Sequence, residues 1–416
     1  MKKEQFFILR KKYPQFHYLN FEFEVKGDCI IMQFFFQANE LVFSPKMSLK
    51  FGRYAQQMNI DEIEGIIFNI GLIELVSYWK ATCSPQIVIH NYTLDKAQQK
   101  WWRKLYYKGL SEFFYQNEID CKRNNFVRFS FAADVKPYID LKFSSLKKDI
   151  RKIVPIGGGK DSVVTLEELR KKSVVIPFII NPRGATLDCA RVAGFNSIND
   201  IVILEREIDA KLLYCNEQGY LNGHTPFSAM LAFYTLLVSY GTGVRDIALS
   251  NEASANEPTV LGTEVNHQYS KSEEFERDFQ KYLLKYMNDC AYYYSALRNL
   301  SELQIAEKFA QHPQYFSVFR SCNVGSKENR WCCNCPKCLF AYIILAPFID
   351  KNRRLEIFGE DLLNKKEMKL YFYQLIGKQV TKPFECVGTV EEVVTALRML
   401  DIDNESSFLL NEFHLL

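Results

Sequence analysis

The chain has 416 residues, of which 48% are hydrophobic and 14% aromatic, so it can bury a large core and is not a disordered protein. Its length exceeds that of a usual single domain, and we expect two or three domains. The 52 basic and 49 acidic residues leave a formal charge of only +3, which argues against a dedicated nucleic-acid-binding protein and favours a small anionic substrate.

No segment predicts export or membrane insertion. The first residues, MKKEQFFILRKKYPQF, contain too short an apolar stretch for a signal peptide. No later stretch offers the roughly 18 uncharged apolar residues that a membrane-spanning helix needs. We therefore expect a soluble cytoplasmic protein with neither a membrane nor a nucleic acid as partner, while the oligomeric state stays open.

Residues 1–145 predict an α+β domain. The segment 18–36 alternates apolar and polar residues around a turn at Lys26-Gly27-Asp28, which predicts a β-hairpin. Asn59 is a candidate N-cap for an amphipathic helix that runs towards Pro85. A strand at 86–90 and a second amphipathic helix around Trp101 and Trp102 follow.

From residue 146 the pattern changes to strands that alternate with helices, which predicts parallel βαβ units and a doubly wound α/β domain over 146–310. The expected strands are 152–156, 173–180, 200–204 and 246–250, and the expected helices include 162–172 and 226–240. Residues 311–416 have a mainly helical pattern and form the third predicted unit.

The sequence VPIGGGKDS, residues 154–162, places three glycines between a buried strand and a helix expected to start near Ser162. Bare backbone N–H groups at a helix N-terminus form an anion site, and glycine allows a phosphate to approach closely. We therefore predict that Gly157, Gly158 and Gly159 bind phosphate. The alternative is a glycine-rich turn that only packs tightly, because a glycine run alone is a weak signal.

The residues after the glycines would complete such a site. Lys160 adds a positive charge, Ser162 adds a hydroxyl donor, and Asp161 adds a carboxylate suited to Mg²⁺ or to orienting the loop. The spacing differs from that of a Walker A loop and from the dinucleotide fingerprint G-x-G-x-x-G. It resembles the PP-loop of the N-type ATP pyrophosphatases, Ser-Gly-Gly-x-Asp-Ser, with Gly157 where that superfamily usually has Ser.

Five of the twelve cysteines crowd into SCNVGSKENRWCCNCPKC. Cys322, Cys332, Cys335 and Cys338 have a spacing that can close a tetrahedron around a structural Zn²⁺, with Cys333 left over or exchanging roles with Cys332. The alternative is a set of free thiols or a redox pair. The remaining cysteines are scattered singly and are interpreted as small buried hydrophobes: Cys29, Cys83, Cys121, Cys189, Cys215, Cys290 and Cys386.

Two polar stretches follow the strand at 246–250, where an open α/β sheet places its ligand groups. The first is NEASANE and the second is VNHQYSK; a polar surface loop is the alternative for both. His224 lies ahead of the helix at 226–240 and joins these segments as an acid/base candidate. The candidates from these segments are Asn251, Glu252, Asn256, Glu257, His267, Tyr269 and Lys271.

Two N-terminal segments, SYWKATCSP and QQKWWRKLYYKGLSEFFYQN, combine aromatic and basic residues. A packed helix face with snorkelling basic side chains explains most of this pattern. A nucleotide or sugar is the alternative ligand, since aromatic faces and nearby charges suit a UDP-sugar. Lys80 and Arg103 are the two substrate-binding candidates here.

Together, FNIGLIELVSYWKATCSP, WWRKLYYKGLSEFFYQN, GGGKDS, SNEASANE, VNHQYSKSEEFE and WCCNCPKC resemble the MurL family of UDP-N-acetylmuramoyl-L-alanyl-L-glutamate epimerases, over about residues 60 to 345. The resemblance implies an ATP- and Mg²⁺-dependent inversion of the terminal L-Glu of UDP-MurNAc-L-Ala-L-Glu to D-Glu during peptidoglycan precursor synthesis, with release of AMP and pyrophosphate.

The chemistry of that reaction explains why ATP is needed. A free carboxylate opposes removal of the neighbouring α-proton, whereas an adenylated carboxyl group can take the new charge as an enolate. Lys160 and Asp161 are the catalytic candidates for adenylation. The base and acid that invert the α-carbon are not ranked by the sequence, and the candidates are His224, Glu252, Glu257, His267 and Tyr269.

Other interpretations remain. Another adenylating enzyme with a PP-loop, similar to 7-cyano-7-deazaguanine synthase, also combines this loop with a four-cysteine site, but has no obvious need for the long N-terminal segment. A tRNA-modifying enzyme is disfavoured by the near-neutral charge. A nucleotide sensor without catalysis would explain Gly157, but not the retained Lys160, Asp161 and Ser162.

Overall fold

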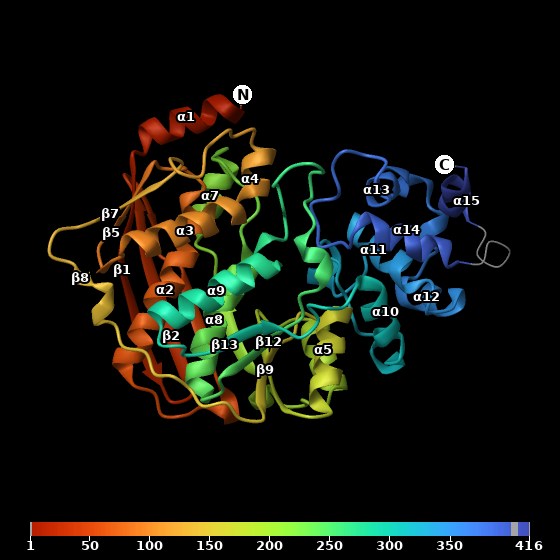
Figure 1. The fold of residues 1–416 in the computed structure, drawn as a ribbon, viewed down its shortest axis with the longest axis horizontal. Coiled ribbons are helices and arrows are strands. Elements are labelled where there is room, and N and C mark those ends of the chain that lie inside the picture. Colours follow the sequence, from red (N-terminus) through yellow and green to blue (C-terminus); the bar gives the residue numbers. More distant parts are fainter. Residues whose placement is uncertain (1, 401–406, 416) are drawn as a thin grey trace.

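The computed structural model describes residues 2–400 and 407–415. One long mixed sheet runs through the N-terminal two thirds of the chain, and a group of helices from the C-terminal third lies beside one end of it (Figure 1). Among the described residues, every helix is too short or too polar to cross a membrane.

The main sheet has eleven strands and the order β13-β12-β9-β10-β11-β4-β2-β1-β5-β7, with β3 added beside β2; β6 and β8 pair separately. The strands are β1 Gln15–Lys26, β2 Cys29–Ala38, β3 Leu41–Phe43, β4 Lys46–Lys50, β5 Gln86–Ile89, β6 Tyr92–Thr93, β7 Arg128–Phe131, β8 Lys136–Pro137, β9 Arg151–Pro155, β10 Val174–Ile180, β11 Val202–Arg206, β12 Asp246–Leu249 and β13 Tyr292–Ser295.

The strands β9 to β13 form a parallel unit inside this sheet. Going outwards from β9, the chain adds β10 and β11 on one side and then β12 and β13 on the other. The strand order therefore reverses between β9 and β12, and ligands of open α/β sheets bind at such a reversal, above the carboxyl ends of the strands. The doubly wound pattern predicted from the sequence matches this arrangement of strands.

Helices cover both faces of the parallel unit. The α-helices of the described residues are α1 Lys2–Lys12, α2 Ile60–Trp79, α3 Lys96–Gly109, α4 Ser111–Gln116, α5 Lys160–Arg170, α6 Ala185–Val192, α7 Ala210–Glu217, α8 Phe227–Thr242, α9 Glu273–Tyr286, α10 Glu302–Ala310, α11 Pro336–Leu345, α12 Lys351–Phe358, α13 Lys369–Leu375, α14 Val390–Arg398 and α15 Phe408–His414.

Alternation along the strands divides the apolar side chains between two cores. Ile153 of β9 and Ile247 of β12 face the core that contains α2, α8, α9 and the N-terminal strands. Val154 and Ala248, the next residue in each strand, face the core that contains α5, α6 and the C-terminal helices. Successive side chains of a strand point to opposite faces, so one sheet serves both cores.

Most of the elements expected from the sequence are present. The predicted hairpin is β1 and β2, and the Asn59 side chain accepts from the backbone N–H of Asp61 at 3.0 Å to cap α2. The helix α2 is buried on nearly every side, because it lies between the N-terminal strands and α8. The sequence patterns had not indicated α1, β4 or β13.

The predicted boundary near residue 145 has no counterpart in the sheet. Strand β4 from the N-terminal segment pairs antiparallel with β11 from the α/β segment, with Leu49 opposite Leu204. The N-terminal segment and one face of the parallel unit also share a core. The division into three sequence units stays a prediction, but the sheet is continuous between the first two.

A buried ion pair fastens these two segments together. Arg206 at the end of β11 donates from Nε and Nη2 to the two carboxylate oxygens of Glu74 in α2, each at 2.9 Å, and Tyr234 of α8 also donates to Glu74. The Glu74 side chain is fully buried and that of Arg206 is 10% exposed. Loss of one partner would leave the other charge buried and unpaired.

We expect Arg206→Met to lower the free energy of unfolding by about 3–5 kcal/mol, because it leaves the Glu74 carboxylate buried without its cation. The control is Arg53→Met. Arg53 contacts Asp200 at 2.9 Å, but its side chain is 60% exposed, so about 1 kcal/mol or less should be lost. Urea unfolding of the three proteins measures both effects, and equal losses in the two variants would contradict the role of the buried pair.

Candidate active site

The glycine loop connects β9 to α5 and exposes its backbone. The helix α5 begins at Lys160, two positions before the expected Ser162, with Gly159 as its N-cap. Gly158 has φ +80° and a Cβ there would lie 2.8 Å from the Ala185 carbonyl carbon, so both conformation and space require glycine. At Gly157 a Cβ would have no atom within 4 Å, because this residue faces open space.

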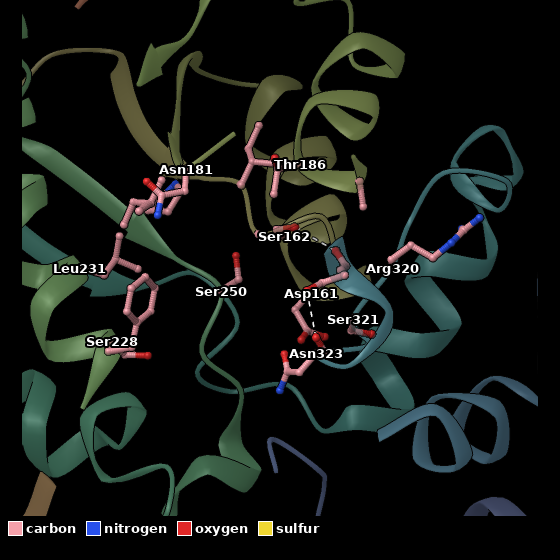
Figure 2. A pocket seen from close by; sticks show the side chains of 18 of the residues that line it. Asp161, Ser162, Asn181, Thr186, Ser228, Leu231, Ser250, Arg320, Ser321 and Asn323 are labelled. Carbon is pink, nitrogen blue, oxygen red and sulfur yellow. Dashed lines mark hydrogen bonds between the residues drawn. The ribbon is translucent and has the colours of Figure 1, made fainter. Parts of the chain in front are cut away.

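That open space is a cavity of about 500 Å³, in the range of roughly 300–1,000 Å³ of ligand pockets. It lies at the strand-order reversal, above the carboxyl ends of β9, β10 and β12. Figure 2 shows Asp161 and Ser162 on one side of it, Ser228 and Leu231 of α8 on the opposite side, and Ser250 after β12 between them. Fold and cavity together define an α/β protein built to hold a ligand at this reversal.

The charged side chains around the cavity are mainly basic. Arg183, Lys271 and Lys337 line it, and Asp161 is the acidic lining residue of the glycine loop. Arg320 also belongs to the lining, but its guanidinium points away from the cavity and donates to the Phe319 and Ser317 carbonyl oxygens. A cavity with these charges suits an anionic ligand.

Lys160 is placed differently from the expectation of a free charge beside a phosphate. Its buried ammonium group contacts the carboxylates of Glu302 in α10 and of Asp161. Burial lowers the pKa of Lys160, but the charges and hydrogen bonds of Asp161 and Glu302 outweigh it and raise the pKa. Lys160 therefore stays charged and fastens the start of α5, while Asp161 reaches the cavity.

A second polar cluster lies beyond Lys271. Glu112 of α4 contacts His267 Nδ1 through Oε2, and the same oxygen lies 3.4 Å from His224 Nδ1. Burial lowers the pKa of His224 to about 3. Lys80 donates to Thr225 Oγ1 at 2.6 Å, and its charge acts on His224. The structure thus brings His224, His267 and Lys80 together around a carboxylate that the sequence analysis did not single out.

His267 is held as an imidazolium. Burial lowers the pKa of His267, but the hydrogen bonds and charges of Cys386 and Glu112 outweigh it and raise the pKa to about 9. Glu112, His224 and His267 offer atoms within 4.8 Å of one another, a distance compatible with a shared metal ion. Without a metal, the Glu112 carboxylate instead holds the charged His267 imidazole in place.

Cys386 is the functional candidate that sequence patterns missed. It was interpreted as a buried small hydrophobe, but the structure makes it half-buried and surrounds it with Lys271, Lys337 and His267. Burial raises the pKa of the Cys386 thiol, but these positive charges outweigh it and hold the pKa well below its usual range. No local motif marks Cys386, because its neighbours come from distant parts of the chain.

Other predicted residues lie apart from the cavity. Arg103 donates from Nε to the Val127 carbonyl oxygen at 3.1 Å and fastens a loop. Asn256 is exposed and accepts from the backbone N–H of Glu273 at the start of α9. The remaining candidates are also occupied: Glu257 pairs with Lys382, and the buried Tyr269 ring has the Lys108 ammonium 5.6 Å from its centre.

Asn251 and Glu252 follow β12 as expected. Asn251 lines the cavity. Glu252 is buried, and its Oε2 has no hydrogen-bond partner among the described residues. Burial raises the pKa of Glu252, with Asp161 and Cys386 adding to the effect, whereas Lys271 and Lys160 oppose it. Burial and these negative charges therefore favour the protonated form of Glu252.

The four predicted cysteines converge beside the cavity. The Sγ atoms of Cys332 and Cys338 are 3.8 Å apart, those of Cys322 and Cys335 are 3.9 Å apart, and those of Cys335 and Cys338 are 3.4 Å apart. All four could hold one metal ion. Cys333 has φ +53° and turns its thiol to the Phe358 carbonyl oxygen, which resolves the choice in favour of Cys332.

Backbone N–H groups support these thiols. Gly325 N–H donates to Cys322 Sγ at 3.1 Å, and Asn334 N–H lies 3.5 Å from Cys332 Sγ. A Cβ at Gly325 would lie 2.2 Å from the Arg330 carbonyl oxygen, so the turn that supplies the first contact needs glycine. Such donors to thiolate sulfur are common around metal sites.

Comparison with known proteins identifies the family. Residues 8–296 match the MurL N-terminal domain and residues 316–410 match the MurL C-terminal domain. The chain belongs to the MurL family. The first match extends across the continuous sheet, and the second contains the cysteine cluster and the C-terminal helices.

Three curated relatives have the same name, UDP-N-acetyl-alpha-D-muramoyl-L-alanyl-L-glutamate epimerase. The relative from Xanthomonas oryzae is 36% identical over 82% of this chain and 76% of its own length. Those from a Micromonospora strain and from Salinispora tropica are each 35% identical over 78% of this chain, which covers 72% and 70% of their lengths.

Proposed function

We propose that this protein is the epimerase that converts the terminal L-Glu of UDP-MurNAc-L-Ala-L-Glu to D-Glu in peptidoglycan precursor synthesis. The observation that carries the proposal is the match to the relatives of that name over most of both chains. The cavity supports it, because the glycine loop and a basic lining meet there. The substrate is a small anion, as the composition favours.

We propose further that the reaction uses ATP at the glycine loop, in the manner of a PP-loop enzyme. The open space at Gly157, the helix start at Lys160 and the basic residues Arg183, Lys271 and Lys337 suit a triphosphate. Asp161 offers a carboxylate for Mg²⁺, which would neutralise phosphate charge. Attack of the substrate carboxylate on the α-phosphate would release pyrophosphate.

The remaining residues of the site would then act on a substrate whose carboxyl group is adenylated. Adenylation removes the negative charge next to the α-carbon, so that a base can take the α-proton and an acid can return one from the opposite face. Lys271 and Asn251 lie at the cavity wall, where they can hold the glutamate end. Hydrolysis would release the inverted dipeptide and AMP.

The direct test is incubation of the protein with ATP, Mg²⁺ and UDP-MurNAc-L-Ala-L-Glu, followed by chiral analysis of the glutamate and assay of AMP and pyrophosphate. We expect D-Glu to form only when both ATP and Mg²⁺ are present. Formation of D-Glu without ATP would refute the adenylation step, and absence of D-Glu under all conditions would refute the epimerase assignment.

Substitutions at Gly157 test phosphate binding without disturbing the fold. A side chain at this position has free space in the protein but would occupy the place of a phosphate, so we expect Gly157→Ala to weaken ATP binding and Gly157→Val to weaken it by about 2 kcal/mol or more. Both variants should unfold at nearly the wild-type temperature. Calorimetric titration with ATP measures the affinity, and wild-type affinity in the valine variant would exclude this loop as the phosphate site.

The four-cysteine cluster is proposed to hold a structural Zn²⁺. Tetrahedral zinc with Zn–S bonds of about 2.3 Å separates its sulfurs by about 3.8 Å, close to the distances between these thiols. With four thiolates the metal has no open position for chemistry. It would instead hold the segment 320–329, which forms one wall of the cavity, against α11.

We expect Cys335→Ser to lose the bound zinc and a large part of its stability, since structural zinc contributes on the order of 10 kcal/mol to folding. Cys333→Ser is the matched control, because its thiol points away from the cluster and the variant should keep the metal. Metal analysis of the purified proteins and their thermal unfolding supply the measurements. Equal zinc content in the two variants would contradict the assignment of the ligands.

A further inference from the structure

The loop before α14 holds Cys386 next to residues that line the cavity. On one side of the cysteine, the Glu385 carboxylate accepts from Asn323 Nδ2 at 2.7 Å, and Asn323 lines the cavity. On the other side, the Val387 carbonyl oxygen accepts from Gln268 Nε2 at 3.3 Å. Cys386 thus lies between the wall of the cavity and the segment that carries His267.

Three positive groups surround the thiol. The charges of Lys271, Lys337 and His267 all act on Cys386, and both Lys271 and Lys337 also line the cavity. A thiol placed among cations is present as the thiolate, which is the basic and nucleophilic form. Cys386 is half-buried as a residue, whereas Cys83 and Cys215 are buried.

Glu112 completes a line of three groups. Its carboxylate holds Nδ1 of His267, and His267 in turn contacts Cys386. A second contact joins α4 to the Cys386 loop. Phe384, two residues before Cys386, packs on Tyr115, one turn after Glu112, with ring centres 5.7 Å apart. A carboxylate, an imidazole and a thiol in this order are the arrangement that keeps a thiolate–imidazolium pair oriented.

Glu252 also lies near Lys271, but its surroundings favour the protonated form, in contrast to those of Cys386. Lys271 acts on both Cys386 and Glu252, but Glu252 is buried and faces the additional negative charges of Asp161 and Cys386. Its Oε2 has no partner among the described residues. Two neighbouring groups whose environments favour opposite protonation states are the pattern of an acid and a base that work together.

We propose that Cys386, as thiolate, and Glu252, as neutral carboxylic acid, are the proton-transfer pair that inverts the α-carbon of the substrate. The inference rests on the proposed epimerase function and assigns its base and its acid. Lys271 is the cation that the developing enolate would meet, and His267 and Glu112 are positioning residues that keep Cys386 charged.

The proton balance of the step is complete. Cys386 Sγ takes the α-proton of the adenylated L-Glu, and the electron pair of the broken C–H bond moves into the carboxyl group as an enolate. The electron pair then returns to the α-carbon, which takes the proton of Glu252 from the opposite face. A neutral thiol and a carboxylate remain, and proton exchange with water restores both groups before the next turnover.

The test follows two partial reactions in D₂O. Pyrophosphate exchange into ATP reports adenylation, and deuterium at the α-carbon reports proton removal. We expect Cys386→Ser to retain substrate-dependent pyrophosphate exchange within roughly threefold, but to lose both deuterium incorporation into L-Glu and formation of D-Glu by about 100-fold or more. Cys29→Ser is the control, because Cys29 is also half-buried but lies in β2, where burial raises the pKa of its thiol.

Glu252→Gln should behave differently from Cys386→Ser. The thiolate would still remove the α-proton of the L-isomer and return a solvent deuteron to the same face. We therefore expect this variant to place deuterium in L-Glu without forming D-Glu. A loss of deuterium incorporation equal to that of Cys386→Ser would overturn the assignment of the two roles.

Alkylation supplies a readout that does not depend on turnover. We expect iodoacetamide at pH 7 to modify Cys386 more than tenfold faster than Cys29, and His267→Asn to reduce that rate, as measured by mass spectrometry of the peptides. Equal rates at the two cysteines, or unchanged epimerisation in Cys386→Ser, would overturn the proposal. If the wild-type protein shows neither pyrophosphate exchange nor epimerisation, the proposed function itself fails instead.

Discussion

The buried contact of Lys160 with Glu302 and Asp161 connects the glycine loop to the rest of the site. It neutralises a lysine that would otherwise be costly to bury, and it fixes the first turn of α5 against α10. The backbone N–H of Glu302 donates to Glu392 in α14 at 2.7 Å, so the same contact reaches the helix that follows the Cys386 loop. The position of the glycine backbone and the position of the thiol therefore depend on one shared set of interactions.

The two-faced sheet explains how distant segments meet at one cavity. The N-terminal segment packs on one face of the parallel strands and the C-terminal helices pack on the other. The contact of Tyr115 with Phe384 joins the two groups. Glu112 comes from the first segment, His267 from the second and Cys386 from the third. The cluster of Glu112, His267 and Cys386 forms where these three segments come together.

The groups that suit phosphate binding and the ionisable groups lie in different parts of the site. The glycine loop presents backbone and little side-chain bulk, which suits a phosphate, whereas the ionisable groups gather around Lys271 at the other part of the cavity wall. In the proposed function this separation would keep activation of the carboxyl group and inversion of the α-carbon in adjacent places. A Zn²⁺ bound by the four-cysteine cluster would stiffen the wall that residues 320–329 form.

The sequence by itself determined the local features of this protein. A strand, three glycines and a helix start lie within a few residues, and the four clustered cysteines lie within seventeen positions, so their geometry follows from short-range chain constraints. The amphipathic patterns likewise predicted most of the helices and the parallel strands. The family resemblance rested on the same contiguous motifs.

Only the tertiary structure decided which charges meet. Lys160 follows the glycines in sequence but turns to Glu302, while Cys386, which carries no motif, lies among Lys271, Lys337 and His267. The sequence patterns also did not predict that the sheet continues across residue 145. The pairing of β4 with β11 joins segments more than 150 residues apart, such as Leu49 and Leu204. Protonation states follow from burial and neighbouring charges, and these depend on contacts between distant residues that no local pattern records.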